Sequence, residues 1–292
     1  MKPGAAPLGK PLALDYHAPM PAGALEGKSI VVVGGTTGLG LSAAKACAAA
    51  GARLVIVGRS SQSLRSALEV LGNAARGLEG DAAGSTTADR AVEEAVRVYG
   101  RLDGLYHVAG GSGRSLGDGP LHETSDDGWQ GTLDWNLSSL FRSNRAAARQ
   151  LLLQQSPGSI LNMGSVLGFA PSPAHFATHA YAAAKSAVIG LTRAAAAYYA
   201  PHGIRFNVLA PGLVETPMAR RAASDPEILE FAATKQPLEH GRLGQPDDLD
   251  GAVVYFLSDA SKWVTGQVLA VDGGWSVCEG QHRPAKEPRR TS

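Results

Sequence analysis

Short apolar runs alternate with helix-like segments along most of the chain. Runs of strand length lie at Ser29–Val33, Arg53–Val57, Ala75–Leu78, Leu105–Val108, Ser159–Met163, Arg205–Leu209 and Gln267–Val271. Segments with helical periodicity lie between them, for example at Gly38–Ala50, Ser85–Tyr99, Trp135–Gln154 and Tyr181–Ala200. This alternation indicates βαβ units around a parallel sheet, and fully apolar runs favour strands that are covered on both faces. We therefore predict one doubly wound α/β domain with about seven parallel strands, flanked by helices on both faces.

The two ends of the chain lack this alternation. Residues 1–28 are rich in proline and alanine, which predicts an N-terminal arm or a disordered extension. Residues 279–292 carry several positive charges and predict a solvated, basic C-terminal tail. The folded domain is therefore expected to cover residues 29–278.

Composition excludes several classes of protein. The 292 residues are 44% hydrophobic and 18% charged, which is too apolar for a disordered chain and too mixed for a membrane protein. A net charge of +1 provides no field for binding nucleic acid. Two cysteines, Cys47 and Cys278, cannot build a disulfide framework. Because the first 28 residues also lack the apolar stretch of a signal peptide, we expect a cytoplasmic protein that is not attached to a membrane.

A glycine-rich turn follows the first apolar run and opens the first helical segment. It contains Gly34, Thr36, Thr37, Gly38, Leu39 and Gly40. Glycines at such a turn let the backbone approach a pyrophosphate, and the helix N-terminus offers free N–H groups to it. This strand–turn–helix context predicts a dinucleotide site of the Rossmann type.

The end of the second strand indicates which dinucleotide binds. NAD sites usually place an acidic residue there, but no Asp or Glu occurs between Glu26 and Glu69. Arg59 and Ser60 stand at this point instead, and a guanidinium can bind a 2′-phosphate with paired donors. We therefore favour NADP(H), while NAD(H) stays possible if Arg59 only stacks on adenine. Asp81, after the third strand, is placed to meet the adenine edge.

Four residues form a candidate catalytic set. Tyr181 and Lys185 are four residues apart on a predicted helix and share one face. Ser165 follows the carboxyl end of a strand, where ligands bind in open α/β sheets. Asn136 lies inside a predicted helix, where a buried amide serves either a water relay or simple core hydrogen bonding. Since a free tyrosine has a pKa of about 10, a nearby ammonium would be needed to make Tyr181 a base near neutral pH.

Together these motifs resemble a classical short-chain dehydrogenase/reductase from about Lys28 to Trp275. Further matching segments are Ala109-Gly110, Pro211–Met218, Gly241–Gly244 and Val271–Gly274. The resemblance implies that Tyr181 is the general acid/base and that Lys185 lowers its pKa and holds the nicotinamide ribose. It also implies that Ser165 polarises the carbonyl, that Asn136 organises a water, and that hydride passes directly between nicotinamide and substrate.

The resemblance also implies a set of cofactor-binding residues and a dimer or tetramer. The set comprises Gly34, Thr36, Thr37, Gly38, Leu39, Gly40, Arg59, Ser60, Asp81, Ala82, Ala109, Gly110, Tyr181, Lys185, Pro211, Gly212, Val214 and Thr216. Val33 and His107 depart from the family pattern, which usually has Thr and Asn at these positions. The long segment Gly168–Phe176 is expected at the mouth of the pocket, and Arg114 could meet an anionic substrate or simply face solvent.

We predict an NADP(H)-dependent oxidoreductase that interconverts a carbonyl and a secondary alcohol, acting as a ketoreductase on a small or mid-sized, largely apolar substrate. Alternatives within the family are an NAD(H)-dependent alcohol dehydrogenase, an imine or enone reductase, and a 3-oxoacyl reductase. A different class is a non-catalytic dinucleotide-binding sensor or scaffold. His175 and His179 have helical spacing but no third ligand, so no metal site is expected.

Overall fold

The computed structural model describes residues 23–280 of the chain. Within this range, seven parallel strands form one sheet in the order β3-β2-β1-β4-β5-β6-β7. The strands are β1 (Ser29–Val33), β2 (Arg53–Gly58), β3 (Ala75–Glu79), β4 (Gly104–His107), β5 (Gly158–Met163), β6 (Ile204–Pro211) and β7 (Val268–Val271). The predicted doubly wound α/β domain is confirmed, with strand ends that differ by up to two residues from the apolar runs.

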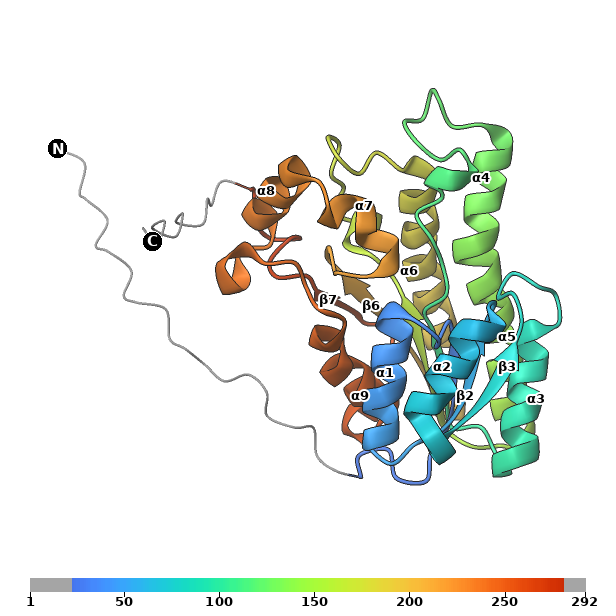
Figure 1. Cartoon of the computed structure of the whole chain (residues 1–292). Helices are drawn as coiled ribbons and strands as arrows, with labels where there is room; N and C mark the ends of the chain where they lie inside the picture. The colour runs from blue at the N-terminus through green and yellow to red at the C-terminus, as the bar shows by residue number, and fades with distance from the viewer. Residues whose placement is uncertain (1–22, 281–292) are drawn as a thin grey trace, which may run out of the picture.

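Helices cover both faces of the sheet (Figure 1). The helices α1 (Gly38–Ala49), α2 (Ser61–Leu71) and α9 (Asp250–Leu257) lie on one face. The other face is covered by α3 (Thr87–Tyr99), α5 (Ser139–Leu153) and α6 (His179–Tyr199). A hydrophobic core lies on each face of the sheet. Alternate residues of β1 pack into the two cores, with Ile30 and Val32 in one and Val31 and Val33 in the other. This double burial explains why the strand sequences are apolar throughout.

The strand order reverses at β1, which lies between β2 and β4. The loops after β1 and β4 therefore leave the sheet in opposite directions and open a crevice at the carboxyl ends of the strands. The segment after β6 covers this end of the sheet through α7 (Arg220–Ala223) and α8 (Pro226–Lys235) (Figure 1). Asp225 separates the two helices and starts the second one by capping the backbone N–H groups of Glu227 and Ile228.

The helix predicted at Trp135–Gln154 begins earlier and is not regular. It starts with α4 (Asp126–Leu133), passes through a π-helical turn at Asp134–Ser138, and continues as α5. Gly128 and Gly131 lie within α4 and weaken its helical signal in the sequence. The π-turn contains Asn136, and π-turns inside helices are frequent at functional sites.

The packed part of the chain begins before residue 29. Leu25 is completely buried, and its N–H donates to the carbonyl of Ala50 at the end of α1. Leu25 thus packs against the domain although it lies within the predicted N-terminal arm. The remainder of the predicted arm, residues 1–22, and most of the predicted tail, residues 281–292, lie outside the described residues.

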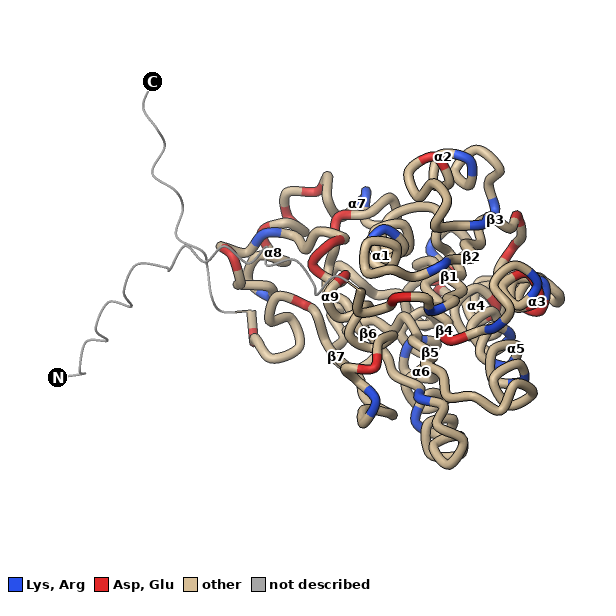
Figure 2. Tube along the Cα trace, turned by 90° about the horizontal axis from the view of Figure 1, so that it is seen from below, with Lys and Arg blue, Asp and Glu red and all other residues tan. Residues whose placement is uncertain are grey.

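Charges are mixed over the surface, and Lys and Arg are interspersed with Asp and Glu along the trace (Figure 2). No helix among residues 23–280 is both long and apolar enough to cross a membrane. In the same part of the chain, no three His, Cys, Asp or Glu side chains gather in a way that could hold a metal ion.

Candidate active site

A cavity of about 620 Å³ opens at the carboxyl ends of the strands. Its wall includes every predicted site residue except Ser60. One end is formed by the glycine turn after β1 and the loop after β2. The other end is formed by Ser165, Tyr181 and the segments around α7. The fold thus brings together residues that lie more than a hundred positions apart in the chain.

The glycine turn has the shape that a dinucleotide requires. A Cβ on Gly40 would lie 2.0 Å from the carbonyl oxygen of Gly34, and one on Gly34 would lie 2.7 Å from the nitrogen of Ala109. Thr37 precedes α1 without a side-chain hydrogen bond to the helix, so the first N–H groups of α1 stay available at the cavity wall. These open donors at a helix N-terminus fit a pyrophosphate group.

The loop after β2 holds Arg59 in a defined place. Its guanidinium carbon lies 5.1 Å from the ring centroid of Trp135, and both side chains line the cavity. Within residues 23–280, no carboxylate oxygen lies within 4.0 Å of this guanidinium. Arg59 is therefore stacked on an indole while its charge stays uncompensated at short range.

The neighbouring serines Ser60 and Ser61 are not among the residues that line the cavity. The Ser60 hydroxyl oxygen accepts from the N–H of Ser63 and caps α2. Ser61 donates to the carboxylate of Glu79 at 2.6 Å. Asp81 and Ala82 do line the cavity, and Asp81 also closes its own turn by accepting from the N–H of Ala83.

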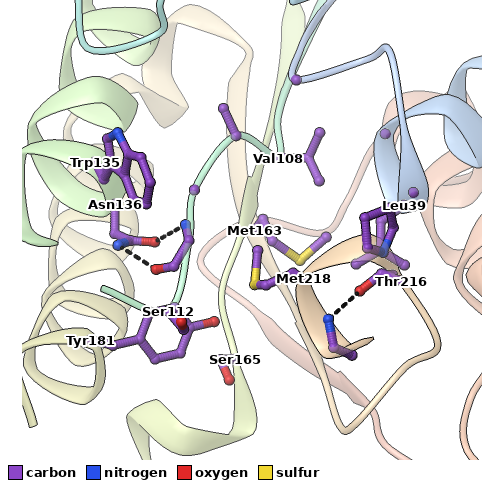
Figure 3. Close-up of a pocket in the computed structure, with 18 of the residues that line it drawn as sticks. Leu39, Val108, Ser112, Trp135, Asn136, Met163, Ser165, Tyr181, Thr216 and Met218 are labelled. Carbon is purple, nitrogen blue, oxygen red and sulfur yellow. Dashed lines mark hydrogen bonds between the residues drawn. The ribbon is translucent and has the colours of Figure 1, made fainter. Parts of the chain in front are cut away.

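Tyr181 and Lys185 project from the first turns of α6. The Lys185 Nζ lies 5.5 Å from the centroid of the Tyr181 ring and donates to the carbonyl of Met163 at 2.9 Å. Only 3% of Lys185 is exposed, and burial lowers the pKa of its ammonium to about 8. The side chains of Ser165 and Tyr181 point into the same part of the cavity (Figure 3).

Burial raises the pKa of Tyr181, and hydrogen bonding from the Ser165 hydroxyl offsets part of that rise. Lys185 was expected to lower this pKa. In the protein without bound cofactor the pKa of Tyr181 is raised instead, because desolvation of the phenol outweighs the other influences. A neutral phenol carries a proton that it can donate. The geometry thus suits Tyr181 as an acid toward a carbonyl oxygen that gains negative charge.

Asn136 makes two hydrogen bonds to the loop after β4 (Figure 3) and a third to α4. Its Nδ2 donates to the carbonyls of Gly111 and Thr132, and its Oδ1 accepts from the N–H of Gly111. A Cβ on Gly110 would lie 2.6 Å from this Oδ1. The amide therefore fixes the cavity wall, which agrees with the alternative of a hydrogen-bonded core asparagine.

Asp118 does not line the cavity, but it positions Tyr181, and the sequence did not predict this role. One carboxylate oxygen accepts from the N–H of Ala180 and the other from the N–H of Tyr181, both at 2.9 Å. These bonds cap the start of α6 and fix the backbone of the tyrosine. The only sequence signal is an acidic residue within a glycine-rich loop, and the fold alone reveals its distant partners.

His107 fills the position where the family usually has asparagine. Its Nδ1 lies 2.9 Å from the hydroxyl of Ser143, and its Nε2 lies 3.3 Å from that of Ser139. Burial lowers the pKa of His107 to about 3, and the charge of Lys185 adds to this effect. A neutral imidazole therefore links the end of β4 to α5 and supplies the hydrogen bonds of this junction.

The sequence and fold are similar to those of known dehydrogenases. A family model described as enoyl-(acyl carrier protein) reductase matches residues 33–276. A 2,5-dichloro-2,5-cyclohexadiene-1,4-diol dehydrogenase of Sphingobium indicum is 34% identical, with 87% of this chain and 98% of that protein aligned. A galactitol 2-dehydrogenase (L-tagatose-forming) of Cereibacter sphaeroides is 36% identical, with 87% and 96% aligned.

Solved structures agree with these sequence relatives. A short-chain type dehydrogenase/reductase from Mycobacterium ulcerans superposes with a TM-score of 0.80 at 31% identity, covering 87% of this chain and 91% of that one. The shared fold, the shared sequence and the dinucleotide-shaped cavity lead to one conclusion. The chain belongs to the classical short-chain dehydrogenase/reductase family of NAD(P)-dependent oxidoreductases.

Proposed function

We propose that this chain is an NADP(H)-dependent reductase of ketones that interconverts a carbonyl and a secondary alcohol with Tyr181 as general acid/base. One observation carries the proposal. The hydroxyls of Tyr181 and Ser165 line the same cavity as an open glycine turn, and Lys185 is buried beside the tyrosine. A protein that only binds a dinucleotide has no use for this set of donors.

The roles of the residues follow from their contacts. The Tyr181 phenol donates its proton to the carbonyl oxygen, and the Ser165 hydroxyl donates a hydrogen bond to the same oxygen. The Lys185 ammonium, held by the Met163 carbonyl, stabilises the phenolate that proton donation leaves behind. Bound NADP(H) supplies or accepts the hydride. Asn136 and Asp118 hold the loop and the helix that position these groups.

The preference for NADP(H) is supported by Arg59. Its guanidinium lies against Trp135, has no carboxylate oxygen within 4.0 Å in the described part of the chain, and lines the cavity. The 2′-phosphate of NADP(H) would accept charge-assisted hydrogen bonds from the Arg59 guanidinium. Gly34, Gly38 and Gly40 would hold the pyrophosphate, while Pro211, Gly212, Val214 and Thr216 would hold the nicotinamide end.

Tyr181→Phe tests the chemical role. General acid catalysis contributes about 10²–10⁴-fold, so the ketone-dependent loss of NADPH absorbance should slow by at least that lower factor. NADPH affinity, measured by calorimetry, should change by no more than about threefold, because the Tyr181 hydroxyl is only one of many groups in the proposed cofactor site. Tyr198→Phe is the matched control, since Tyr198 lies on the same helix and is 72% exposed. Turnover by Tyr181→Phe within a few-fold of wild type would remove the tyrosine from the mechanism.

A panel of ketone, imine and enone substrates separates ketone reduction from the other family activities.

Arg59→Gln tests the cofactor preference. Calorimetric titration of the wild type should show NADPH binding about tenfold or more tighter than NADH, which corresponds to about 1.4 kcal/mol. The variant should lose this preference through weaker NADPH binding, with NADH binding unchanged. Arg65→Gln on the exposed face of α2 removes an equal charge and serves as the control. Equal affinities of the wild type for the two cofactors would favour the NAD(H)-dependent alternative.

We also propose a homo-oligomer, either a dimer or a tetramer. Phe141 and Leu153 on α5 are 45% and 79% exposed, and Trp263 ahead of β7 is 96% exposed. Exposed apolar residues of this size are typical of subunit contacts. Light scattering after gel filtration should give a mass of two or four chains, and a monomer mass would reject the assembly.

A further inference from the structure

Two arginines from distant segments meet at the substrate end of the cavity. Arg114 lies in the short 3-10 helix after β4, and Arg221 lies in α7. The Nη2 of each guanidinium donates to the same carbonyl oxygen, that of His175, at 3.1 Å. The two Nη2 atoms are therefore no farther apart than twice this distance. Both side chains are exposed, so water screens part of the repulsion between these like charges, and an anion bound between them would relieve the rest.

The described part of the chain does not supply that anion. Within residues 23–280, neither Arg114 nor Arg221 has a carboxylate oxygen within 4.0 Å. Asp118 is the acidic residue that acts on Arg114, and its two carboxylate oxygens already cap the start of α6. The two guanidinium charges of Arg114 and Arg221 exceed the single carboxylate charge of Asp118, so this corner of the cavity has a net positive charge.

The two guanidiniums still have donors to offer. Each has five N–H groups in a planar fork, and the contact with His175 occupies one of them. Both arginines line the same cavity as Tyr181, and the wall beside them is apolar, with Phe176, Met218 and Trp275. A ligand here meets a cationic clamp at one end and an apolar middle.

We infer that the substrate carries an anionic oxyacid group, namely a carboxylate, phosphate or sulfonate, which Arg114 and Arg221 bind together while its carbonyl faces Tyr181. The anion restores the charge balance of the pair, and paired N–H donors match the oxygens of such a group. The apolar wall then accommodates a short carbon chain between the anion and the reacting carbonyl. The inference about the carbonyl rests on the proposed function, whereas the inference about the anion does not.

A purely structural role for the pair makes a different prediction. Both arginines would then only fasten the long segment before α6 through the His175 carbonyl. In that case, loss of Arg221 would lower thermal stability and weaken every ligand equally. Recognition of an anion predicts instead that the loss falls on charged ligands alone.

Binding measurements separate these two outcomes without any need for turnover. The full-length protein, saturated with NADP⁺, is titrated by calorimetry with hexanoate, hexyl phosphate, hexanesulfonate and the uncharged hexanamide. At least one anion should bind about tenfold more tightly than hexanamide, or tighter still. The anion that binds most tightly then identifies which oxyacid group the site prefers. Arg221→Gln should abolish this preference, and Arg221→Lys should restore part of it. Arg193→Gln, an equal charge change at an exposed site farther along α6, should leave it intact.

Higher salt should weaken binding of the anions and leave hexanamide unaffected. No preference of the wild type for any anion over hexanamide would overturn the inference. The same holds if Arg221→Gln, shown to be folded by its thermal transition, weakens anions and hexanamide by the same factor.

A kinetic comparison distinguishes failure of the inference from failure of the proposed function. We expect NADPH-dependent reduction of 5-oxohexanoate with a kcat/KM about tenfold or more above that of its methyl ester, mainly through KM. Reduction of acid and ester with equal kcat/KM would keep the reductase activity and overturn the anionic substrate. Reduction of neither, together with selective anion binding, would overturn the ketone reductase and keep the anion site.

Discussion

Replacing Lys185 with methionine removes a buried charge and should make the cofactor-free protein more stable. The ammonium is 3% exposed, and burial lowers its pKa from 10.5 to about 8. Each pKa unit corresponds to about 1.4 kcal/mol, so holding the charged form in the folded state costs about 3 kcal/mol at pH 7. Loss of the hydrogen bond to the Met163 carbonyl returns about 1 kcal/mol of this. The variant should therefore gain about 2 kcal/mol in free energy of unfolding.

The pH dependence identifies the cause. The folded-state pKa of Lys185 lies below the unfolded-state value, so the penalty is complete below pH 8 and disappears as pH rises toward 10.5. The advantage of the variant should consequently shrink by about 1 kcal/mol between pH 7 and pH 9. Other titrating groups are common to both proteins and cancel in the difference.

Urea denaturation of the two proteins at both pH values provides the assay, with circular dichroism as the signal. Lys262→Met is the control because Lys262 is exposed, and it should change stability by less than about 0.5 kcal/mol. Two results would refute the reasoning: a variant less stable than wild type at pH 7, or an advantage that is the same at pH 7 and pH 9. The variant should also be inactive, since the proposed mechanism needs the ammonium beside the phenol.

Further predictions concern other parts of the domain. Asp118→Ala should lower the free energy of unfolding by about 1–2 kcal/mol through loss of the cap on α6, and should reduce kcat more than NADPH affinity; denaturation and steady-state kinetics check this. Gly40→Ala forces a Cβ against the carbonyl of Gly34 and should destabilise the protein by about 1–3 kcal/mol while weakening NADPH binding in calorimetry. Cys47 is completely buried, and burial raises its pKa to about 12, so an aromatic disulfide reagent should react quickly with Cys278 alone until the protein is denatured.

The strands and most of the cavity wall were predictable because their signals are local. A strand such as β1, buried on both faces, is apolar at every position, and the glycine turn after it has to be free of side chains. Tyr181 and Lys185 are likewise joined by helical spacing alone. The α4 helix escaped prediction because its glycines and polar residues hide its period, and tertiary contacts hold it in place.

The rest of the site depends on contacts between distant segments. Asp118 meets the start of α6 only because the loop after β4 folds over it, and nothing near Asp118 in the chain indicates that partner. Arg114 and Arg221 come together on one carbonyl for the same reason. Ser60 shows that a residue can also have a local role, since its hydroxyl oxygen caps α2 by accepting from the N–H of Ser63. The direction of the Tyr181 pKa shift required knowledge of burial, which spacing does not contain.

The placement of the indoles gives the protein two built-in optical reporters. Trp275 is 2% exposed and packs edge-on against Phe176 and Phe231, with centroid distances of 5.6 and 5.8 Å, at the substrate end. Trp135 lies beneath Arg59 at the nucleotide end. The other two tryptophans of the chain, Trp129 and Trp263, are 39% and 96% exposed and contribute mainly background emission. With phenylalanine at those two positions, the protein would emit only from Trp275 at the substrate end and Trp135 at the nucleotide end. Binding at the substrate end would then change the quantum yield of Trp275, and binding at the nucleotide end that of Trp135.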